Sequence, residues 1–345
     1  MRVINHGYHL RSLSMTKAVG SSKKKLSSFS ELKSSSLMMK KDVKRYEITS
    51  SELKVKLNKI VKDVKQNSLV EITIKDKKNT EDSFAKLVNS LDKSYAYEMK
   101  KDQHEEGGKG IHKINLDASP GLYANWSRNA LSPVYPHSED SYDPKGVDVF
   151  AVVFLKNNIK LPLQLLPIRD SVDLLLGSHE DRSKQSEFNI ELKKEVPLAF
   201  SFWTNLSLDE KAGLLTTKKF LNKSGANIDN LQEAACSFLF HGNDMQLCAN
   251  WNCNEDRLAL LDNSFESKCL YEVIQRAILF TFKHNTIDLI ESDKIVIFPN
   301  YHYFHGRLAL NDTHLKELNG ADLERTLVRS KLKIKNPATA SLFNS

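Results

Sequence analysis

Residues 135–155 read YPHSEDSYDPKGVDVFAVVFL, a polar segment followed by an apolar run. The run from Val147 to Leu155 is interrupted only by Asp148, so it predicts a buried β-strand that is too short to span a bilayer. In the polar segment, His137 and Glu139 are two residues apart, and side chains with this spacing share one face of an extended chain. The two side chains could therefore bind one metal ion.

A third metal ligand is expected from a distant strand. Residues 300–307 (NYHYFHGR) follow the apolar segment 294–298, which places His305 just past a strand end. Two histidines and one carboxylate leave part of the metal open, an arrangement typical of non-haem Fe(II) oxygenases. An H-x-E tripeptide also occurs by chance, and His302 or His305 could be structural.

In the rest of the chain, short apolar runs bounded by turn residues predict strands, and segments with helical spacing lie between them. The predicted strands are 69–74, 110–116, 147–155, 161–168, 238–241, 247–251, 294–298 and 327–334, and the predicted helices are 49–65, 82–91, 208–221, 230–235 and 270–284. The polar segment 178–197 is expected to be a mobile insertion that could act as a lid. This pattern indicates an α+β protein built around a β-sandwich or barrel.

Charge separates a leader from the rest of the chain. Residues 1–100 carry 22 lysines and arginines against 11 acidic residues, whereas residues 101–345 carry 28 against 32. We expect residues 1–44, rich in serine and lysine, to be a disordered leader, with a transit peptide as the alternative, and residues 45–345 to form a single domain. Lysines among serines favour a solvated tail over a nucleic-acid or membrane partner. The four cysteines lack paired spacing, which favours reduced thiols in a cytoplasmic protein.

Three sequence blocks resemble one known family. HSEDSY (137–142) with the following strand (148–155) resembles the HTED-aromatic segment and strand of the clavaminate synthase-like oxygenases, within the TauD-type Fe(II)/2-oxoglutarate superfamily. SDKIVIFPN (292–300) followed by HGR resembles the strand before the family's distal histidine, and ERTLVR (324–329) resembles its D-R-W-L-x-R element. The arginine and asparagine β-hydroxylases of peptide-antibiotic pathways are most similar, because they share the glutamate ligand. The resemblance implies a distorted double-stranded β-helix (jelly-roll) core with flanking helices.

The resemblance also implies roles for particular residues. His137, Glu139 and His305 would be the catalytic ligands of Fe(II). Arg325 would pair with the distal carboxylate of 2-oxoglutarate, for which a planar guanidinium is well suited. Gln164 stands near the position of a threonine that helps to bind this cosubstrate. Arg329 would hold a substrate carboxylate, with a surface salt bridge as the alternative.

Five further residues are candidates for substrate binding. Glu106, in a segment similar to the family's E/Q-x-Gly lip, would meet the substrate ammonium group, and Ser127 and Asn129 lie in the loop leading to the iron. Asn250 and Asn252 stand where arginine hydroxylases have acidic residues, which disfavours a guanidinium substrate. Ser292, Pro299 and the long interval between His305 and Arg325 depart from the family pattern.

The implied activity is a dioxygenase reaction that uses O2 and 2-oxoglutarate to hydroxylate an unactivated C–H of an amino acid or amino-acid-derived small molecule, with succinate and CO2 as co-products. Desaturation and cyclisation would use the same residues. The substrate could be free or attached to a carrier protein, and the sequence leaves the oligomeric state open. A jelly-roll metal enzyme of another class, a hydrolase or isomerase, and a non-catalytic binding module are the alternatives.

Overall fold

A computed structural model of the chain describes eleven stretches of the sequence. These are residues 43–66, 68–76, 80–94, 97–99, 111–115, 133–139, 147–222, 235–241, 247–254, 258–307 and 325–334. Nearly all of the expected leader and most of the helix predicted at 230–235 therefore lie outside the described residues. The first strand begins at Val43, inside the segment assigned to the leader.

The largest sheet has seven strands, and its principal order is β1-β2-β14-β6-β16-β3, with β4 also paired to β16. Their bounds are β1 Val43–Ile48, β2 Leu69–Ile74, β3 Tyr97–Met99, β4 Ile111–Asn115, β6 Val149–Asn157, β14 Lys294–Pro299 and β16 Arg325–Ile334. Strands β1 and β2 are parallel, so a crossover is required, and helix α2 (Leu53–Lys65) provides it. The other pairings in this sheet are antiparallel.

Strand β6 is buried on both faces, which explains its continuous apolar sequence. Val149, Ala151 and Val153 pack with the layer formed by α2 and α3 (Thr80–Ser94). The alternate residues Phe150 and Val152 belong to a different cluster on the inner face of the sheet. Side chains alternate across a strand, so one sequence supplies two cores.

A second, four-stranded antiparallel sheet covers that inner face. Its order is β13-β7-β15-β5, with bounds Ile287–Leu289, Leu163–Pro167, Tyr303–Arg307 and Val134–His137. Leu163, Leu165 and Tyr303 point inward to the cluster shared with β6. Leu166 and Phe304 point to the opposite side and pack among the helices. The side chain of His305, two residues after Tyr303, consequently faces the space between the sheets.

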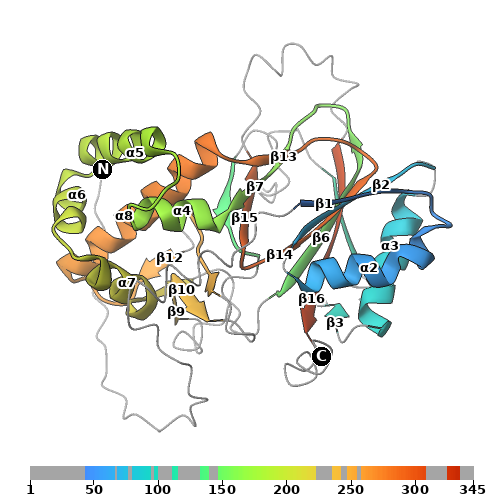
Figure 1. Ribbon diagram of the computed structural model, residues 1–345, viewed down its shortest axis with the longest axis horizontal. Coiled ribbons are helices and arrows are strands. Elements are labelled where there is room, and N and C mark those ends of the chain that lie inside the picture. Colours follow the sequence, from blue (N-terminus) through green and yellow to red (C-terminus); the bar gives the residue numbers. More distant parts are fainter. Residues whose placement is uncertain are drawn as a thin grey trace, which may run out of the picture.

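Five helices form the remaining layer, at the left of Figure 1. They are α4 Ile168–Leu175, α5 Arg182–Glu195, α6 Pro197–Thr204, α7 Leu208–Thr217 and α8 Phe265–His284. Two small sheets accompany them, formed by β8 Lys219–Asn222, β9 Ala235–Ser237 and β12 Leu258–Leu260, and by β10 Leu239–His241 and β11 Leu247–Ala249. The chain is thus arranged as helices, four-stranded sheet, seven-stranded sheet and helices (Figure 1).

The expectation for residues 178–197 is wrong. This segment contains α5, which begins after Asp181, whose side chain accepts hydrogen bonds from the backbone N–H groups of Ser183 and Lys184. Phe188 and Leu192 are buried in the helical core. Apart from the exposed Ile190, the rest of the helix is polar, and its N-cap and two buried side chains fix a segment of low apolar content.

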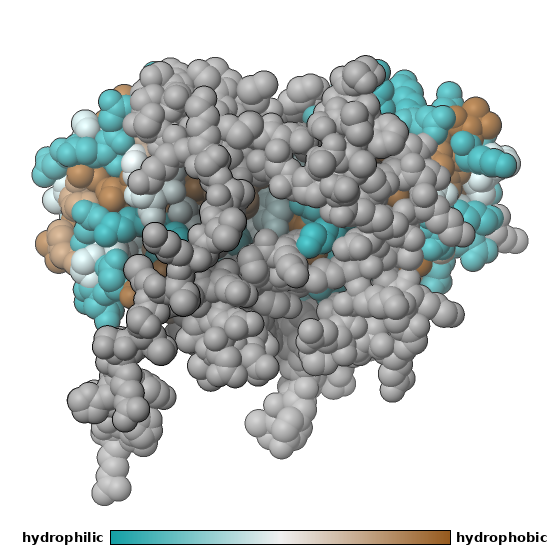
Figure 2. All heavy atoms as spheres, turned by 90° about the horizontal axis from the view of Figure 1, so that it is seen from below, coloured by the Kyte–Doolittle hydropathy of each residue, from teal (hydrophilic) through white to brown (hydrophobic). Residues whose placement is uncertain are grey.

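Surface polarity varies over the described residues. Hydrophilic and apolar residues lie beside one another at both ends of the molecule in Figure 2. Among the described residues, no helix is long and apolar enough to cross a membrane.

Candidate metal centre

Two residues that are close in sequence meet a distant third between the two large sheets. His137 ends β5, and its cross-strand partner is His305 on β15. Glu139 follows β5 after one residue, and the ligand atoms of all three side chains lie within 4.8 Å of one another. This is a group of side chains that could hold a metal ion, and it contains His305 rather than His302.

The ligand atoms converge on one carboxylate oxygen. Glu139 Oε2 lies 3.2 Å from His305 Nε2 and 3.9 Å from His137 Nε2. His137 Nδ1 lies 2.8 Å from the carbonyl oxygen of Tyr135, so a proton on Nδ1 leaves Nε2 as a lone-pair donor. The His305 ring stacks on Phe150, with centroids 5.0 Å apart. These contacts orient both imidazoles.

Burial sets the charge state of the histidines. Removal from water, followed by the nearby His305, lowers the pKa of His137 to about 4. Burial also lowers the pKa of His302 to about 4. His137 is therefore neutral at pH 7, which is the form that binds a metal.

The backbone around Glu139 is fixed by Asn300, a fully buried residue just past β14. Asn300 Oδ1 accepts a hydrogen bond of 2.8 Å from the Glu139 N–H, and its Nδ2 donates to the Glu139 carbonyl oxygen at 2.9 Å. Nδ2 also donates to the Val147 carbonyl oxygen at 2.9 Å. One amide side chain thereby fixes the Glu139 backbone at both its N–H and its carbonyl group.

The second carboxylate oxygen of Glu139 faces two cations from β16. Arg329 Nη1 lies 3.1 Å and Lys331 Nζ 2.9 Å from Glu139 Oε1. Burial alone would raise the pKa of Glu139, but Arg329, Lys331 and the hydrogen bond to His305 outweigh it and hold the pKa well below its usual range. Glu139 is therefore an anion with one oxygen directed to the imidazoles and one to the cations.

A second cationic region contains Arg325, which is 5% exposed. Its guanidinium lies over the ring of Phe154 at 4.7 Å, and its Nε donates to the Leu161 carbonyl oxygen at 3.1 Å. Burial, followed by the neighbouring Arg307, lowers the pKa of Arg325 to about 9. An anion bound here would offset part of the cost of burying the Arg325 guanidinium.

Gln164 is placed away from the metal centre. It pairs with Gly306 in the β7–β15 ladder, whereas the adjacent Leu165 pairs with His305. Adjacent residues point to opposite faces, so Gln164 lies on the helical side of the sheet. There its Nε2 donates to Thr286 at 3.3 Å and to Asp288 at 3.2 Å.

The other predicted residues have different outcomes. Asn252 forms an isolated antiparallel bridge with His137, so the segment containing Asn250 and Asn252 does lie beside the metal ligands. Asn252 Oδ1 accepts from the N–H of Asn254 at 3.0 Å, which is a local turn contact. The remaining candidates, Glu106, Ser127 and Asn129, lie outside the described residues.

Gly306 has a steric reason to be glycine. A Cβ atom at this position would lie 2.7 Å from the carbonyl oxygen of Val134 and 3.0 Å from Phe282 Cζ. The β15–β5 pairing also shifts register between His305 and Arg307. The glycine thus lets α8 and β5 approach the strand that carries the metal ligand.

Three residues important for this geometry received no role from the sequence: Asn300, Arg307 and Lys331. The first two lie inside segments that resemble family motifs, and these positions could have indicated a role in the site. Lys331 lies two residues after Arg329 in a predicted strand. Period-two alternation alone could have placed its side chain on the same face as Arg329.

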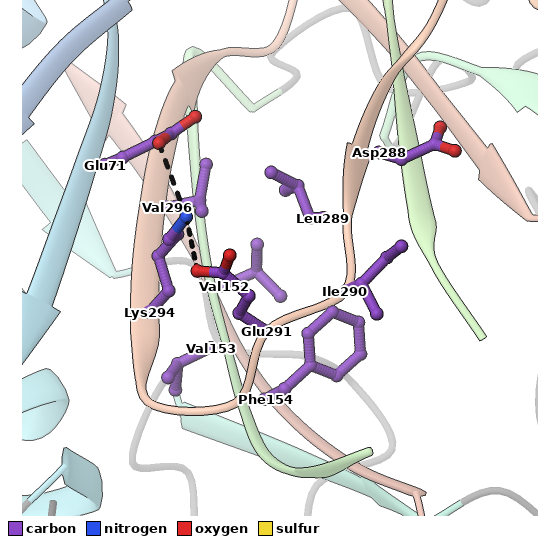
Figure 3. Close-up of a pocket in the computed structure, with 10 residues that line it drawn as sticks. All are labelled: Glu71, Val152, Val153, Phe154, Asp288, Leu289, Ile290, Glu291, Lys294 and Val296. Atoms are coloured by element: carbon purple, nitrogen blue, oxygen red, sulfur yellow. Dashed lines mark ion pairs between the residues drawn. The ribbon is translucent and has the colours of Figure 1, made fainter. Parts of the chain in front are cut away.

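A pocket of about 120 Å³ lies at the other edge of the four-stranded sheet. Phe154, Leu289 and Val296 are among its apolar lining residues, and Lys294 lies between Glu71 and Glu291 (Figure 3). Lys294 Nζ is 3.7 Å from Glu71 Oε2 and 2.6 Å from Glu291 Oε2. Lys294 thus bridges two carboxylates, and no histidine is among the residues that line this pocket.

Comparison with solved structures identifies the class of fold. The chain shares its fold with non-haem iron oxygenases, which confirms the resemblance to the clavaminate synthase-like and TauD-type proteins at the level of the fold. No protein-family model and no curated protein matches the sequence.

Two of these structures are informative. One is the non-haem iron oxygenase OrfP in complex with Fe and alpha-ketoglutaric acid, with a TM-score of 0.53 and 12% identity over 85% of this chain and 94% of that chain. The other is an asparagine oxygenase in complex with Fe(II), 2S,3S-3-hydroxyasparagine and succinate, with a TM-score of 0.52 and 11% identity over 83% of this chain and 80% of that one.

Proposed function

We propose that this protein is an Fe(II)- and 2-oxoglutarate-dependent oxygenase that hydroxylates an aliphatic C–H of an amino acid or amino-acid-derived small molecule. The observation that carries the proposal is the convergence of His137, Glu139 and His305 between the two sheets of a fold shared with non-haem iron oxygenases. In this proposal the two sheets form the distorted double-stranded β-helix core. Its single domain begins no later than Val43, where β1 starts, rather than at the expected residue 45.

The donor set fits Fe(II). Two imidazoles and one carboxylate are the ligands of the facial triad, which leaves open positions on the metal. Bound iron and 2-oxoglutarate would supply the oxidising chemistry, in which substrate and O2 yield the hydroxylated product, succinate and CO2. The protein's contribution is to keep His137 neutral, Glu139 ionised and the His305 ring fixed against Phe150.

Arg325 fits the distal carboxylate of 2-oxoglutarate. Its guanidinium is buried on the inner side of the seven-stranded sheet and forms a cation–π contact with Phe154. Arg307, whose pKa is lowered to about 10 by burial, adds positive charge close by. A dicarboxylate with one end at the metal could place its other end against the planar guanidinium of Arg325.

Arg329 is the proposed partner of the substrate carboxylate. It combines an ion pair to Glu139 with a side chain that is 20% exposed, so a ligand can reach it. The solved structures include OrfP with (3S)-hydroxy-L-Arg and the asparagine oxygenase with hydroxyasparagine, and this supports an amino acid as the substrate class. Asn250 and Asn252 favour a neutral polar side chain, and Glu106, Ser127 and Asn129 remain proposed contacts.

The test is an anaerobic titration with Fe(II) and 2-oxoglutarate. The wild type should develop the weak visible charge-transfer band of the iron–2-oxoglutarate chelate, and His137→Ala should not. Succinate release in air would then be screened against amino acids. Failure of 2-oxoglutarate to bind metal-loaded protein would overturn the proposal and favour a hydrolase, an isomerase or a binding module.

A further inference from the structure

We propose that Lys331 is a positioning residue that holds Glu139 Oε1, so that Glu139 offers the metal a single oxygen and leaves room for a chelating 2-oxoacid. This inference rests on the proposed function. It concerns a residue of this chain that has no role in the proposal above, and it follows from the arrangement of charges around one carboxylate.

The two carboxylate oxygens of Glu139 have different partners. Oε2 is the oxygen near the two histidine nitrogens, at 3.2 and 3.9 Å. Oε1 is the oxygen near Lys331 Nζ, at 2.9 Å, and Arg329 Nη1, at 3.1 Å. Turning both oxygens to the same metal would break the Arg329 hydrogen bond and the Lys331 ion pair at Oε1.

The two cations that contact Glu139 Oε1 differ in their exposure to solvent. Arg329 and Lys331 pair with Val152 and Phe150 of β6, and both occupy the inner face of β16. The Lys331 side chain is only 6% exposed, whereas that of Arg329 is 20% exposed. Lys331 is therefore the enclosed partner of Glu139, and Arg329 is the one that solvent and ligands can reach.

Substrate binding would change the contacts of Glu139 Oε1. A substrate carboxylate at Arg329 would compete with Glu139 for the guanidinium. Lys331 would then remain as the partner of Oε1, so the buried carboxylate would keep a counter-charge on that side. A buried acceptor that loses its last partner is costly, and this explains why two cations share one oxygen.

Removal of the Lys331 ammonium group would release Glu139 Oε1. Glu139 would gain freedom to place both oxygens on the metal and occupy a position that a chelating 2-oxoacid requires. Metal binding itself would survive, because all three ligands remain. The selective result is weaker binding of 2-oxoglutarate with little change in the affinity for Fe(II).

The experiment compares Lys331→Met and Lys331→Arg with the wild type in the full chain. Anaerobic Fe(II) affinity would be measured by equilibrium dialysis, and 2-oxoglutarate affinity by titrating the charge-transfer band. We expect Lys331→Met to weaken 2-oxoglutarate binding about tenfold and to shift the band, with Fe(II) affinity within about threefold of the wild type. Lys331→Arg, which keeps the charge, should restore both signals.

Matched variants separate positioning from general damage. Lys113→Gln removes the same charge from β4, where the side chain is 51% exposed, and should change neither affinity. Arg329→Met leaves Lys331 in place and should weaken 2-oxoglutarate binding less than Lys331→Met does. Lys331→Gln keeps a hydrogen-bond donor and provides a second variant if the methionine protein unfolds. Thermal unfolding would verify that each variant is folded.

The outcomes distinguish this inference from the proposed function. If the wild type binds no 2-oxoglutarate, the proposed function fails. If the wild type shows the band and folded Lys331→Met and Lys331→Gln show the same band and affinity, only the role of Lys331 is overturned. Equal losses of Fe(II) and 2-oxoglutarate binding in these variants would also overturn it, because they would indicate a structural role.

Discussion

Two buried carboxylates lie at the two ends of the space between the sheets, and each is matched by two cations. Glu71, at the β13 end, is paired with Arg45 and Lys294, and Glu139, at the β5 end, with Arg329 and Lys331. Their side chains are almost equally buried, at 7% and 8% exposure. Burial and ion pairing therefore do not by themselves mark the functional carboxylate.

The two sites differ in the partners of the second carboxylate oxygen and in the solvent exposure of the cations. Arg45 and Lys294 both contact Oε2 of Glu71, and Arg45 is 70% exposed to solvent. At Glu139 the cations occupy one oxygen while two imidazoles converge on the other. A carboxylate with one oxygen held by cations and the other directed at two imidazoles is suited to a metal, whereas Glu71 has the contacts of a structural ion pair.

The largest expected effect tests this comparison directly. Glu139→Gln should lower Fe(II) affinity by at least about 100-fold, since even residues outside the ligand set account for about 10- to 100-fold. It also leaves the enclosed Lys331 without its carboxylate, so the free energy of unfolding without metal should fall by about 3 kcal/mol. Equilibrium dialysis and urea denaturation would measure the two effects.

Glu71→Gln is the matched control for that experiment. It makes the same chemical change in an equally buried carboxylate and should leave Fe(II) affinity unchanged. Equal losses of Fe(II) affinity in the two variants would contradict the division between a metal-binding and a structural carboxylate.

Part of this comparison could be predicted from the sequence. His137, Glu139 and His305 were identified from their spacing and from the family resemblance, and β2 coincides with its predicted range because its apolar residues are buried on both faces. The cross-strand pairing of His137 with His305 depends on tertiary structure. Spacing could propose the ligands but not their convergence.

The other features of the site could be predicted only once the positions of the two facing sheets were known. Gln164 and Leu165 are neighbours in sequence, and only the β7–β15 register shows which of them shares a face with His305. The sequence range of α5 lacks a regular apolar stripe, so its pattern does not reveal a helix held by Phe188 and Leu192. Lys331 is one lysine among many until β16 is placed opposite Glu139.

The second prediction concerns the backbone of the metal-binding end. Asn300→Ala removes three hydrogen bonds to the peptide groups of Glu139 and Val147 and leaves buried groups without partners. The free energy of unfolding should fall by about 2 kcal/mol. Fe(II) affinity should fall as well, because the Glu139 backbone is no longer fixed. Urea denaturation and metal dialysis would provide the two readouts.

Asn157→Ala supplies the matched control. Asn157 is also buried and hydrogen-bonds the backbone of Leu161 and Ile290. None of these hydrogen bonds involves Glu139. A similar loss of stability with unchanged Fe(II) affinity is expected. If Asn300→Ala behaved in the same way, the positioning role of Asn300 would be wrong.

The third prediction separates two cationic regions, one formed by Arg329 and Lys331 and the other containing Arg325. Arg325→Lys keeps the charge but loses the planar guanidinium, so 2-oxoglutarate affinity should fall about tenfold, or about 1.4 kcal/mol. Fe(II) affinity should be unchanged, because Arg325 contacts none of the ligands in the described contacts. Arg169→Lys, in an ion pair on α4, is the control. Unchanged 2-oxoglutarate affinity would argue against Arg325 as its partner.

The smallest expected effect is the stability change at the other end. In Glu71→Gln, Arg45 is free to be solvated and Lys294 keeps its 2.6 Å contact with Glu291. Neither cation is left enclosed without compensation, so the free energy of unfolding should change by about 1 kcal/mol or less. Urea denaturation of Glu71→Gln and Glu139→Gln, both without metal, would compare the ends directly. A loss at Glu71 as large as that at Glu139 would mean that burial of the carboxylate, rather than the enclosure of its cations, determines the cost.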